Sequence, residues 1–466
     1  MKNIRGPIAL AGKKTNNRNV IIALITAVVI INYFEIYYHI WFLKLLGGYV
    51  IKIWLLPVAL VCYILARRFF VKDLHIPLEG IKGINVLIVF YFVIGLASLL
   101  IHEQPYYIGK YGLIMFAPLA MYAAIVDGLR DNRQIEKVLK ILFIGGLFLS
   151  LTVLILFKIV TPSVWDNDVI KLKHMLTDVV DTYKLREFYH IHGFGYGNFV
   201  RRETLLGVDE PAFAAMLAPL ILAGFYYAMN STGLLRLFFY YISSFFMFYT
   251  ITNTLARSSL IAFIIGLIPF LWHIKKRIRD ILIILIGITV IISANQAMQY
   301  RFIQLIGSTA QEVIDKSSAA QEIIDKVKTK VDFSGDGHIE SLSKTLIDFK
   351  EAPFLGNGIS YIEGKYKNDR QYAEHNRYLY ILSTAGLLTV IPYAAFIIGL
   401  IVIARKTLLY KLKTNTSNFN IGLILYPSVL LFAIQINNVG MERYYYWIFF
   451  GLAAAWIRNT KKEIEK

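Results

Sequence analysis

The stretch QYAEHNRYLYILSTAGLLTVIPYAAFIIGLIVIARK, residues 371–406, has polar residues before a long apolar run and two basic residues after it. The apolar run, 378–402, exceeds the roughly 20 residues that an α-helix needs to cross a hydrocarbon core about 30 Å thick. It therefore predicts a membrane-spanning helix. The polar residues at its start, Glu374 to Arg377, need a separate explanation.

The same apolar pattern recurs along the whole chain, which has 466 residues and is 57% hydrophobic but only 17% charged. This composition exceeds what one soluble core can bury. We predict twelve membrane spans, at 20–38, 50–67, 83–101, 110–127, 139–160, 210–229, 234–252, 258–273, 280–296, 378–402, 419–437 and 443–458. The expected fold is therefore all-α: a polytopic integral membrane protein with residues 1–466 in a single membrane domain.

The net charge of +18 is explained by topology and not by nucleic acid. If the spans alternate in direction, the basic clusters all fall on one side, which the positive-inside rule makes cytoplasmic. With an even number of spans, both termini are then cytoplasmic. The clusters are Lys13, Lys14 and Arg18; Arg67, Arg68 and Lys72; Arg130, Arg133 and Lys137; Lys275, Lys276, Arg277 and Arg279; Arg405, Lys406, Lys411 and Lys413; and Arg458, Lys461 and Lys462.

Two long connections, 161–209 and 297–377, fall on the external side in this arrangement. Loops longer than about 12 to 15 residues are uncommon unless they carry function. The second contains AQEVIDK at 310–316 and AQEIIDK at 320–326, with apolar positions at helical spacing. This repeat predicts amphipathic helices on the membrane surface. A soluble helical hairpin packed on the other loop is an equal alternative.

No cofactor or metal site is expected from the short motifs in these loops. GFGYG at 193–197 lacks the βαβ context of a dinucleotide fingerprint. The segment that begins at Asp332 resembles a calcium loop, but Ser343 occupies the position where a bidentate Glu is required. His190 and His192 lack a third ligand at a recognisable spacing. We interpret these as turns and surface histidines.

Polar residues also gather at the external starts of three predicted spans. Arg201, Arg202 and Glu210 precede or begin one span, Arg257 begins another, and His375, Asn376 and Arg377 introduce a third. Each set has an ordinary explanation, because arginines snorkel to lipid headgroups and asparagines cap helices. Together the three sets also fit a catalytic site. A guanidinium binds phosphate bidentately, and an imidazole accepts a proton near neutral pH. The combination suits a diphosphate at the headgroup level.

Four stretches carry a family resemblance. AEHNRYLYILSTAGLL resembles the His-Asn-x-x-Leu-x-x-Leu-x-x-x-Gly element of the O-antigen ligase and polymerase family, membrane glycosyltransferases that use polyprenyl-diphosphate-linked glycans. NTLARSSLIAFIIG resembles its Ser-Arg-rich turn, RRETLLGVDEPAFAAML its Arg-x-x-x-x-Gly…Pro entrance, and LIDFKEAPFLGNGISY its Pro-Leu-x-Gly-x-Gly stretch. The four occur in the family order over roughly residues 200 to 400.

The resemblance implies glycosyl transfer on the external face of the bacterial cytoplasmic membrane, without a cofactor or metal. The donor would be an undecaprenyl-diphosphate-linked glycan and the acceptor a second glycan, in contact with membrane lipids. The implied catalytic residues are His375, Arg257, Arg202 and Glu210, and the implied substrate-binding residues are Arg201, Arg301, Asn376 and Arg377. A protein that regulates chain length would be a further partner, and nucleic acid is not expected as one.

Departures from the family pattern bear on the acceptor. Where ligases commonly have Pro-Asn, this chain has Glu210-Pro211-Ala212, which is more similar to polymerases of capsule and O-antigen repeat units. His338 replaces an arginine that often precedes the Gly-x-Gly stretch. The favoured activity is therefore that of a polymerase, with an O-antigen ligase as the first alternative. A lipid-linked oligosaccharide flippase is the second, although it would be expected to show related halves and polar residues deep within several spans.

Overall fold

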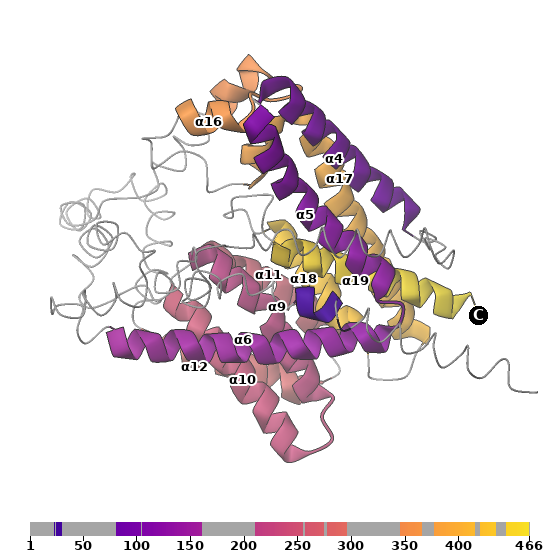
Figure 1. Ribbon diagram of the computed structural model, residues 1–466. Helices are drawn as coiled ribbons and strands as arrows, with labels where there is room; N and C mark the ends of the chain where they lie inside the picture. The colour runs from indigo at the N-terminus through magenta and orange to yellow at the C-terminus, as the bar shows by residue number, and fades with distance from the viewer. Residues whose placement is uncertain are drawn as a thin grey trace, which may run out of the picture.

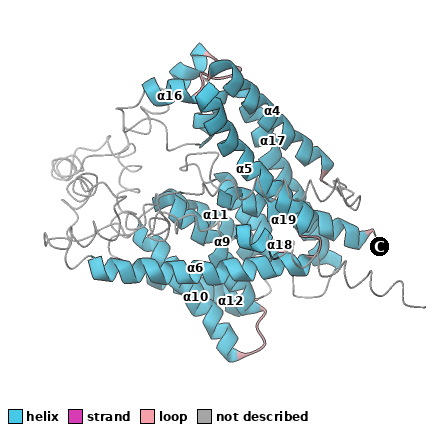
Figure 2. Cartoon of the chain, in the orientation of Figure 1, coloured by secondary structure: helices cyan, strands magenta, loops and turns pink. Residues whose placement is uncertain are grey.

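The computed structural model describes residues 23, 25–29, 81–103, 105–160, 210–254, 257–274, 277–295, 345–365, 377–414, 420–434 and 444–465. In this part of the chain every regular element is an α-helix (Figure 2). The helices are α4 Lys82–His102, α5 Pro105–Gly128, α6 Asn132–Val160, α9 Glu210–Met229, α10 Leu234–Thr254, α11 Arg257–His273, α12 Ile278–Ala294, α16 Ile359–Lys365, α17 Arg377–Thr414, α18 Gly422–Ile434 and α19 Tyr444–Ile464.

The all-α prediction is confirmed for these residues, and ten of the twelve predicted spans overlap described helices, although α6, α17 and α19 extend beyond the predicted bounds. The predicted spans 20–38 and 50–67 lie largely or wholly outside the described residues. Three described helices are long and apolar enough to cross a membrane: α4, α10 and the segment Tyr378–Thr414 of α17. The total of twelve and the orientation remain predictions.

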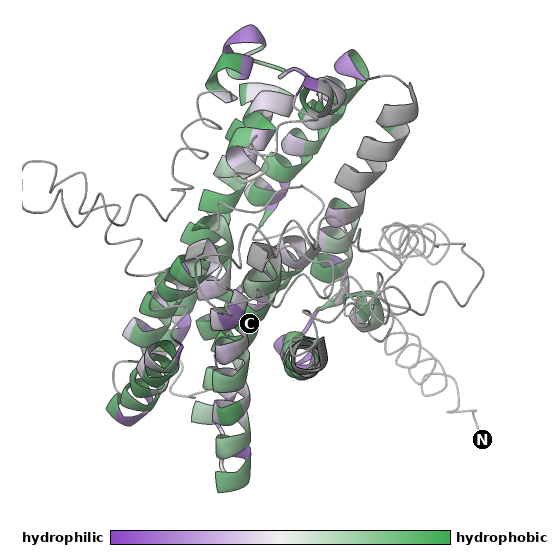
Figure 3. Ribbon diagram, turned by 90° about the vertical axis from the view of Figure 1, so that its left-hand side faces the viewer, coloured by the Kyte–Doolittle hydropathy of each residue, from purple (hydrophilic) through white to green (hydrophobic). Residues whose placement is uncertain are grey.

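Most residues of the long helices are apolar, as Figure 3 shows by colour for the described part of the chain. Along α4, Val86, Val89, Phe90 and Val93 are each more than half exposed. Water would disfavour such a continuous apolar face, whereas hydrocarbon would not. The outer face of α4 therefore suits a hydrocarbon environment, as the polar outer face of a soluble helix suits water.

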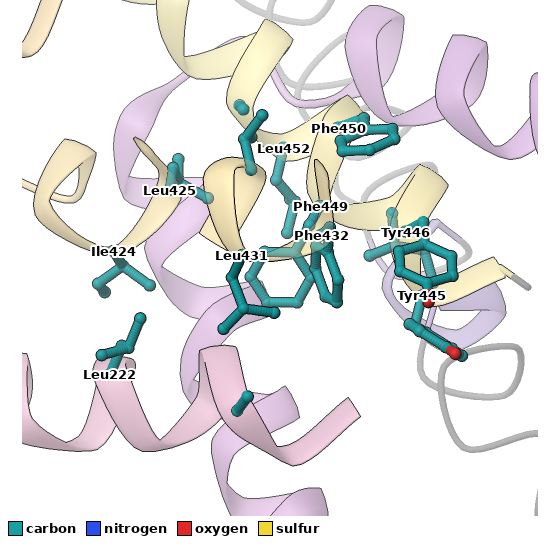
Figure 4. Packing of buried hydrophobic residues seen from close by; sticks show 14 of the residues in the cluster. Leu222, Ile424, Leu425, Leu431, Phe432, Tyr445, Tyr446, Phe449, Phe450 and Leu452 are labelled. Carbon is teal, nitrogen blue, oxygen red and sulfur yellow. The ribbon is translucent and has the colours of Figure 1, made fainter. Parts of the chain in front are cut away.

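Two groups of helices pack around a shared centre (Figure 1). In one group α4, α5, α17 and α19 lie together; in the other, α9, α10, α11 and α12 do. α18 joins the groups: its Ile424 lies beside Leu222 of α9, and its Phe432 packs against Tyr446 of α19 with ring centroids 4.9 Å apart (Figure 4). α6 runs at a large angle to α4 and α17 in Figure 1 and packs on α9, α10 and α19.

Basic side chains bind the ends of neighbouring helices within each group. The Arg458 guanidinium of α19 donates to the Val126 and Leu129 carbonyls at the end of α5, and Lys411 of α17 pairs with Glu463 of α19 at 2.5 Å. In the other group, Arg277 donates to the Met229 carbonyl at 2.6 Å. A cation beside the last carbonyls of a helix interacts favourably with the helix dipole. The side on which each basic cluster lies remains a prediction.

Candidate active site

Five of the eight predicted site residues lie outside the described residues: Arg201, Arg202, Arg301, His375 and Asn376. The other three begin helices. Glu210 is the first residue of α9, Arg257 of α11 and Arg377 of α17. The structure therefore locates three helix starts, and their relative positions define the candidate site.

The start of α9 lies near the end of α10, because the two helices are antiparallel. Phe225, late in α9, packs against Tyr241 and Phe245 in the first half of α10, with ring centroids 6.2 and 5.3 Å apart. Glu210 is therefore on the side where α10 ends at Thr254. α11 begins only three residues after Thr254, so the starts of α9 and α11 share one end of this helix group.

The start of α11 points towards the end of α18. His273, at the end of α11, lies 6.1 Å from the Tyr426 ring near the start of α18, while Gly266 packs against Leu431. α18 is therefore antiparallel to α11. The start of α17 reaches the same place, because the Tyr378 hydroxyl donates to the Ala433 carbonyl at 2.7 Å. All three helix starts consequently gather around the end of α18.

Three converging helix starts create a site suited to an anion. The first backbone N–H groups of a helix lack intrahelical partners, and the helix dipole places partial positive charge at this end. Such ends bind phosphate in many proteins. Here the sequence adds an arginine at two of the three starts, Arg257 and Arg377, and a carboxylate at the third, Glu210.

The start of α17 reaches α18 because α17 is broken at Gly386, which has φ 74° and ψ −179°. In a continuous helix, Tyr378 and Tyr393 would be roughly 22 Å apart along the axis. Their ring centroids are only 6.0 Å apart. The arm 377–385 therefore folds back beside the arm that starts at 387. The predicted single span 378–402 is corrected accordingly: only the second arm, about 40 Å long at 1.5 Å per residue, can cross the membrane.

The break is held open by the segment PFLGNG, residues 353–358, which docks against it. On one side of Gly386, the N–H groups of Leu387 and Leu388 donate to the carbonyls of Pro353 and Phe354, at 2.9 and 3.2 Å. On the other side, the last carbonyls of the first arm, which lack helical partners, are also satisfied. Ser383 and Thr384 accept from the N–H groups of Asn357 and Gly358, at 2.9 and 3.0 Å. The segment thus replaces the hydrogen bonds that the helix loses.

Glycine is required at both contacting positions. Gly356 and Gly386 have φ of +72° and +74°, a region that L side chains rarely adopt. A Cβ on Gly356 would meet the backbone of Thr384 and Ala385, and one on Gly386 would meet the Phe354 carbonyl. The two family-like motifs, Pro-Phe-Leu-Gly-Asn-Gly and the one ending in Gly386, are therefore two halves of one structural joint.

The end of α4 holds the other side of this joint. The Ser98 hydroxyl donates to the Leu355 carbonyl at 2.6 Å, next to the break. Beyond it, the buried Glu103 carboxylate accepts from the backbone N–H of Ser360 at 2.8 Å and from the Ser360 hydroxyl. α16 is thereby fixed against the tip of α4 (Figure 1).

No group of three or more His, Cys, Asp or Glu side chains is arranged to hold a metal ion within the residues that the structure describes. The predicted helices at 310–316 and 320–326, the calcium-like loop and the His190–His192 pair lie outside those residues. Metal independence therefore stays a prediction.

About a third of the chain matches a known family. Residues 242–394 match the O-antigen ligase family. The match runs from α10 through the first part of α17, so it includes Arg257, both contacting glycines and the residues His375 to Arg377. The resemblance inferred from the motifs is confirmed over this range. No curated protein matches the chain.

The match does not extend to every predicted site residue. Arg201, Arg202 and Glu210 precede it, so their entrance stretch rests on the motif alone. The match to the O-antigen ligase family over residues 242–394 and the apolar helices together indicate an integral membrane protein. O-antigen ligase-type proteins are glycosyltransferase-like enzymes that act on a lipid-linked glycan and an acceptor.

Sequence reasoning missed the break at Gly386 and the contacts of Ser98 and Glu103. A glycine inside an apolar helical pattern costs about 1 kcal/mol relative to alanine, which is a signal that a backbone irregularity is required. The Gly-x-Gly of residues 356–358 gave a second such signal. Nothing in the sequence indicated that the two would meet.

Proposed function

We propose that this protein is a membrane glycosyltransferase that polymerises undecaprenyl-diphosphate-linked glycan repeat units on the external face of the bacterial cytoplasmic membrane. One observation carries the proposal: the starts of α9, α11 and α17 gather around the end of α18, and two of them carry an arginine. The family match over residues 242–394 supports the reaction class.

In the proposed reaction, a sugar hydroxyl of the acceptor attacks the anomeric carbon of the donor glycan. The bond from that carbon to the diphosphate oxygen breaks, and the undecaprenyl diphosphate leaves with the electron pair. His375 takes the proton of the attacking hydroxyl, with Glu210 as the second candidate base. Fixed cations stabilise the charge that develops on the leaving group.

The arginines are proposed to differ in which part of the substrate they contact. Arg257 and Arg202 are proposed to contact the diphosphate, with Arg201, Arg301 and Arg377 as further substrate contacts and Asn376 beside them. The partial positive charge of three helix starts acts in the same direction as the guanidinium groups. A diphosphate at this position would therefore be held by both side chains and backbone.

The nature of the acceptor separates the two enzymatic alternatives. Glu210-Pro211-Ala212 favours a polymerase, for which the acceptor is another lipid-linked repeat unit. For an O-antigen ligase the acceptor would be lipid A-core. A polymerase would also admit a partner that regulates chain length. Both termini are expected on the cytoplasmic side in either case.

Reconstitution with defined substrates tests the proposal. Purified protein in liposomes receives a lipid-linked repeat unit, and the products are analysed by mass spectrometry. A polymerase yields lipid-linked products longer by whole repeat units, whereas a ligase yields product only when lipid A-core is added. Transfer of the repeat unit across the bilayer without any new glycosidic bond would instead identify a flippase and overturn the proposal.

A further inference from the structure

The end of α4 lies outside the family match yet contacts the joint on which the proposed site depends. Glu103 follows the last residue of α4, and its side chain is 8% exposed. A buried carboxylate requires hydrogen-bond donors, and Ser360 supplies two, its backbone N–H at 2.8 Å and its hydroxyl. Gly358 packs directly on His102 and Glu103, so that a Cβ at this position would clash.

A chain of hydrogen bonds leads from this carboxylate to the proposed site. Glu103 fixes Ser360, and Gly358, two residues earlier, donates to the Thr384 carbonyl at 3.0 Å. Thr384 belongs to the short arm of α17, whose other end carries Arg377 and follows His375 and Asn376. The arm is held at both ends, because Tyr378 is bonded to Ala433 of α18. A shift of the 353–360 segment would therefore move one of the two anchors that position the arm.

We infer that Glu103 is a positioning residue: by anchoring Ser360 it sets the docking of the 353–358 segment on the Gly386 break, and so the position of the short α17 arm that begins at Arg377. The inference rests on the proposed function for its catalytic consequence. Its structural part stands independently, because the contacts do not depend on which reaction takes place.

The carboxylate is the appropriate group for this task. An ionised carboxylate accepts only, and hydrogen bonds to a charged acceptor are about twice as strong as those between neutral groups. Gln has the same shape, but only its carbonyl oxygen can accept, so Glu103→Gln should weaken the anchor and Glu103→Ala should remove it. Ser360→Ala removes only the hydroxyl donor and provides a third, milder variant.

The test combines hydrogen exchange with kinetics on the full-length protein in liposomes. In Glu103→Ala, the amides of Asn357, Gly358, Leu387 and Leu388 should exchange about tenfold faster or more, with smaller increases in Glu103→Gln and Ser360→Ala. Turnover with a lipid-linked repeat unit should fall by roughly 10- to 100-fold, in the same order, while donor binding changes little. Glu351→Gln is the matched control, because this carboxylate pairs with Tyr361 and Lys365 of its own segment.

Each outcome decides a separate point. Unchanged exchange at the four amides in Glu103→Ala overturns the inference, whatever the activity. Faster exchange with unchanged turnover leaves Glu103 a structural anchor and overturns its positioning role. If the parental protein transfers no glycan, the proposed function fails and the catalytic part of the inference fails with it, whereas the exchange data still decide whether Glu103 holds the joint. If Glu103→Ala does not fold, Glu103→Gln and Ser360→Ala give the same readouts.

Discussion

The ring centroids of Tyr378 and Tyr393 are 6.0 Å apart, although both residues belong to α17 and a straight helix would separate them by roughly 22 Å. This contact exists because the helix folds back at Gly386. It brings the start of α17 to the end of α18, towards which α11 also points. The fold-back therefore connects two family-like motifs to the proposed chemistry.

Substitution of the glycine at the fold-back should destabilise the protein. Gly386→Ala requires alanine at a φ of +74° and places a Cβ against the Phe354 carbonyl, so we expect a loss of ~2 kcal/mol or more in unfolding free energy. Gly399→Ala in the same helix is the control, since its Cβ would meet only Ile84 at 3.8 Å. Thermal unfolding in detergent measures both. Equal Tm values for the two variants would mean that α17 is continuous.

A disulfide should form across the joint. Phe354 and Leu388 are exposed and linked by a backbone hydrogen bond of 3.2 Å, so cysteines at both positions should cross-link on mild oxidation. The native Cys62 is first replaced by Ser. Phe354→Cys paired with Leu412→Cys, at the far end of α17, is the control. Cross-linking of the control but not of the test pair would contradict the docking.

Glycan transfer should depend on the planar guanidinium group of Arg257 and not only on its charge. Lysine keeps the charge but loses the planar fork of donors, so Arg257→Lys should lose most glycan transfer while inserting normally, and Arg257→Ala should be no better. Arg236→Lys, an exposed arginine near the start of α10, should transfer at the parental rate. Transfer assays and membrane fractionation provide the measurements. Full activity in Arg257→Lys would reduce Arg257 to a snorkelling anchor.

Substitutions at His375 and Asn376 distinguish a catalytic role from helix capping. His375→Gln retains hydrogen bonding but cannot act as a base near neutral pH, so turnover should fall by about 10²- to 10⁴-fold while donor binding persists. Asn376→Ser keeps a capping side chain and should be nearly neutral if Asn376 only begins the helix. Transfer rate and donor binding are measured separately. Loss of both in His375→Gln would make His375 a substrate contact instead of a base.

The topology also makes a direct prediction. Reporters fused after Arg133, Lys276 or Lys411 should be cytoplasmic, because basic clusters are retained on that side, and reporters within 165–200 or 305–370 should be external. Paired reporters that are active on opposite sides of the membrane give the measurement at each position. An external signal from the 275–279 connection would reverse the orientation and remove the proposed external site.

The sequence by itself determined where the helices are and what chemistry their ends carry. Apolar runs of membrane length and basic clusters are local properties, so the bounds of α4, α9 and α11 were predictable to within a few residues. The motif order was also sufficient to recognise the family over residues 242–394. Both are read from neighbours along the chain and require no knowledge of the fold.

Only the tertiary structure decided that α17 is broken and what fills the break. A helix loses four N–H and four carbonyl partners wherever it is interrupted, so an interruption inside a helix is stable only if another segment supplies them. The PFLGNG segment does so from thirty residues upstream, and Glu103 fixes that segment from more than two hundred and fifty residues away. Hydrogen bonds between such distant segments leave no periodic trace in the sequence, because they depend on how the helices pack.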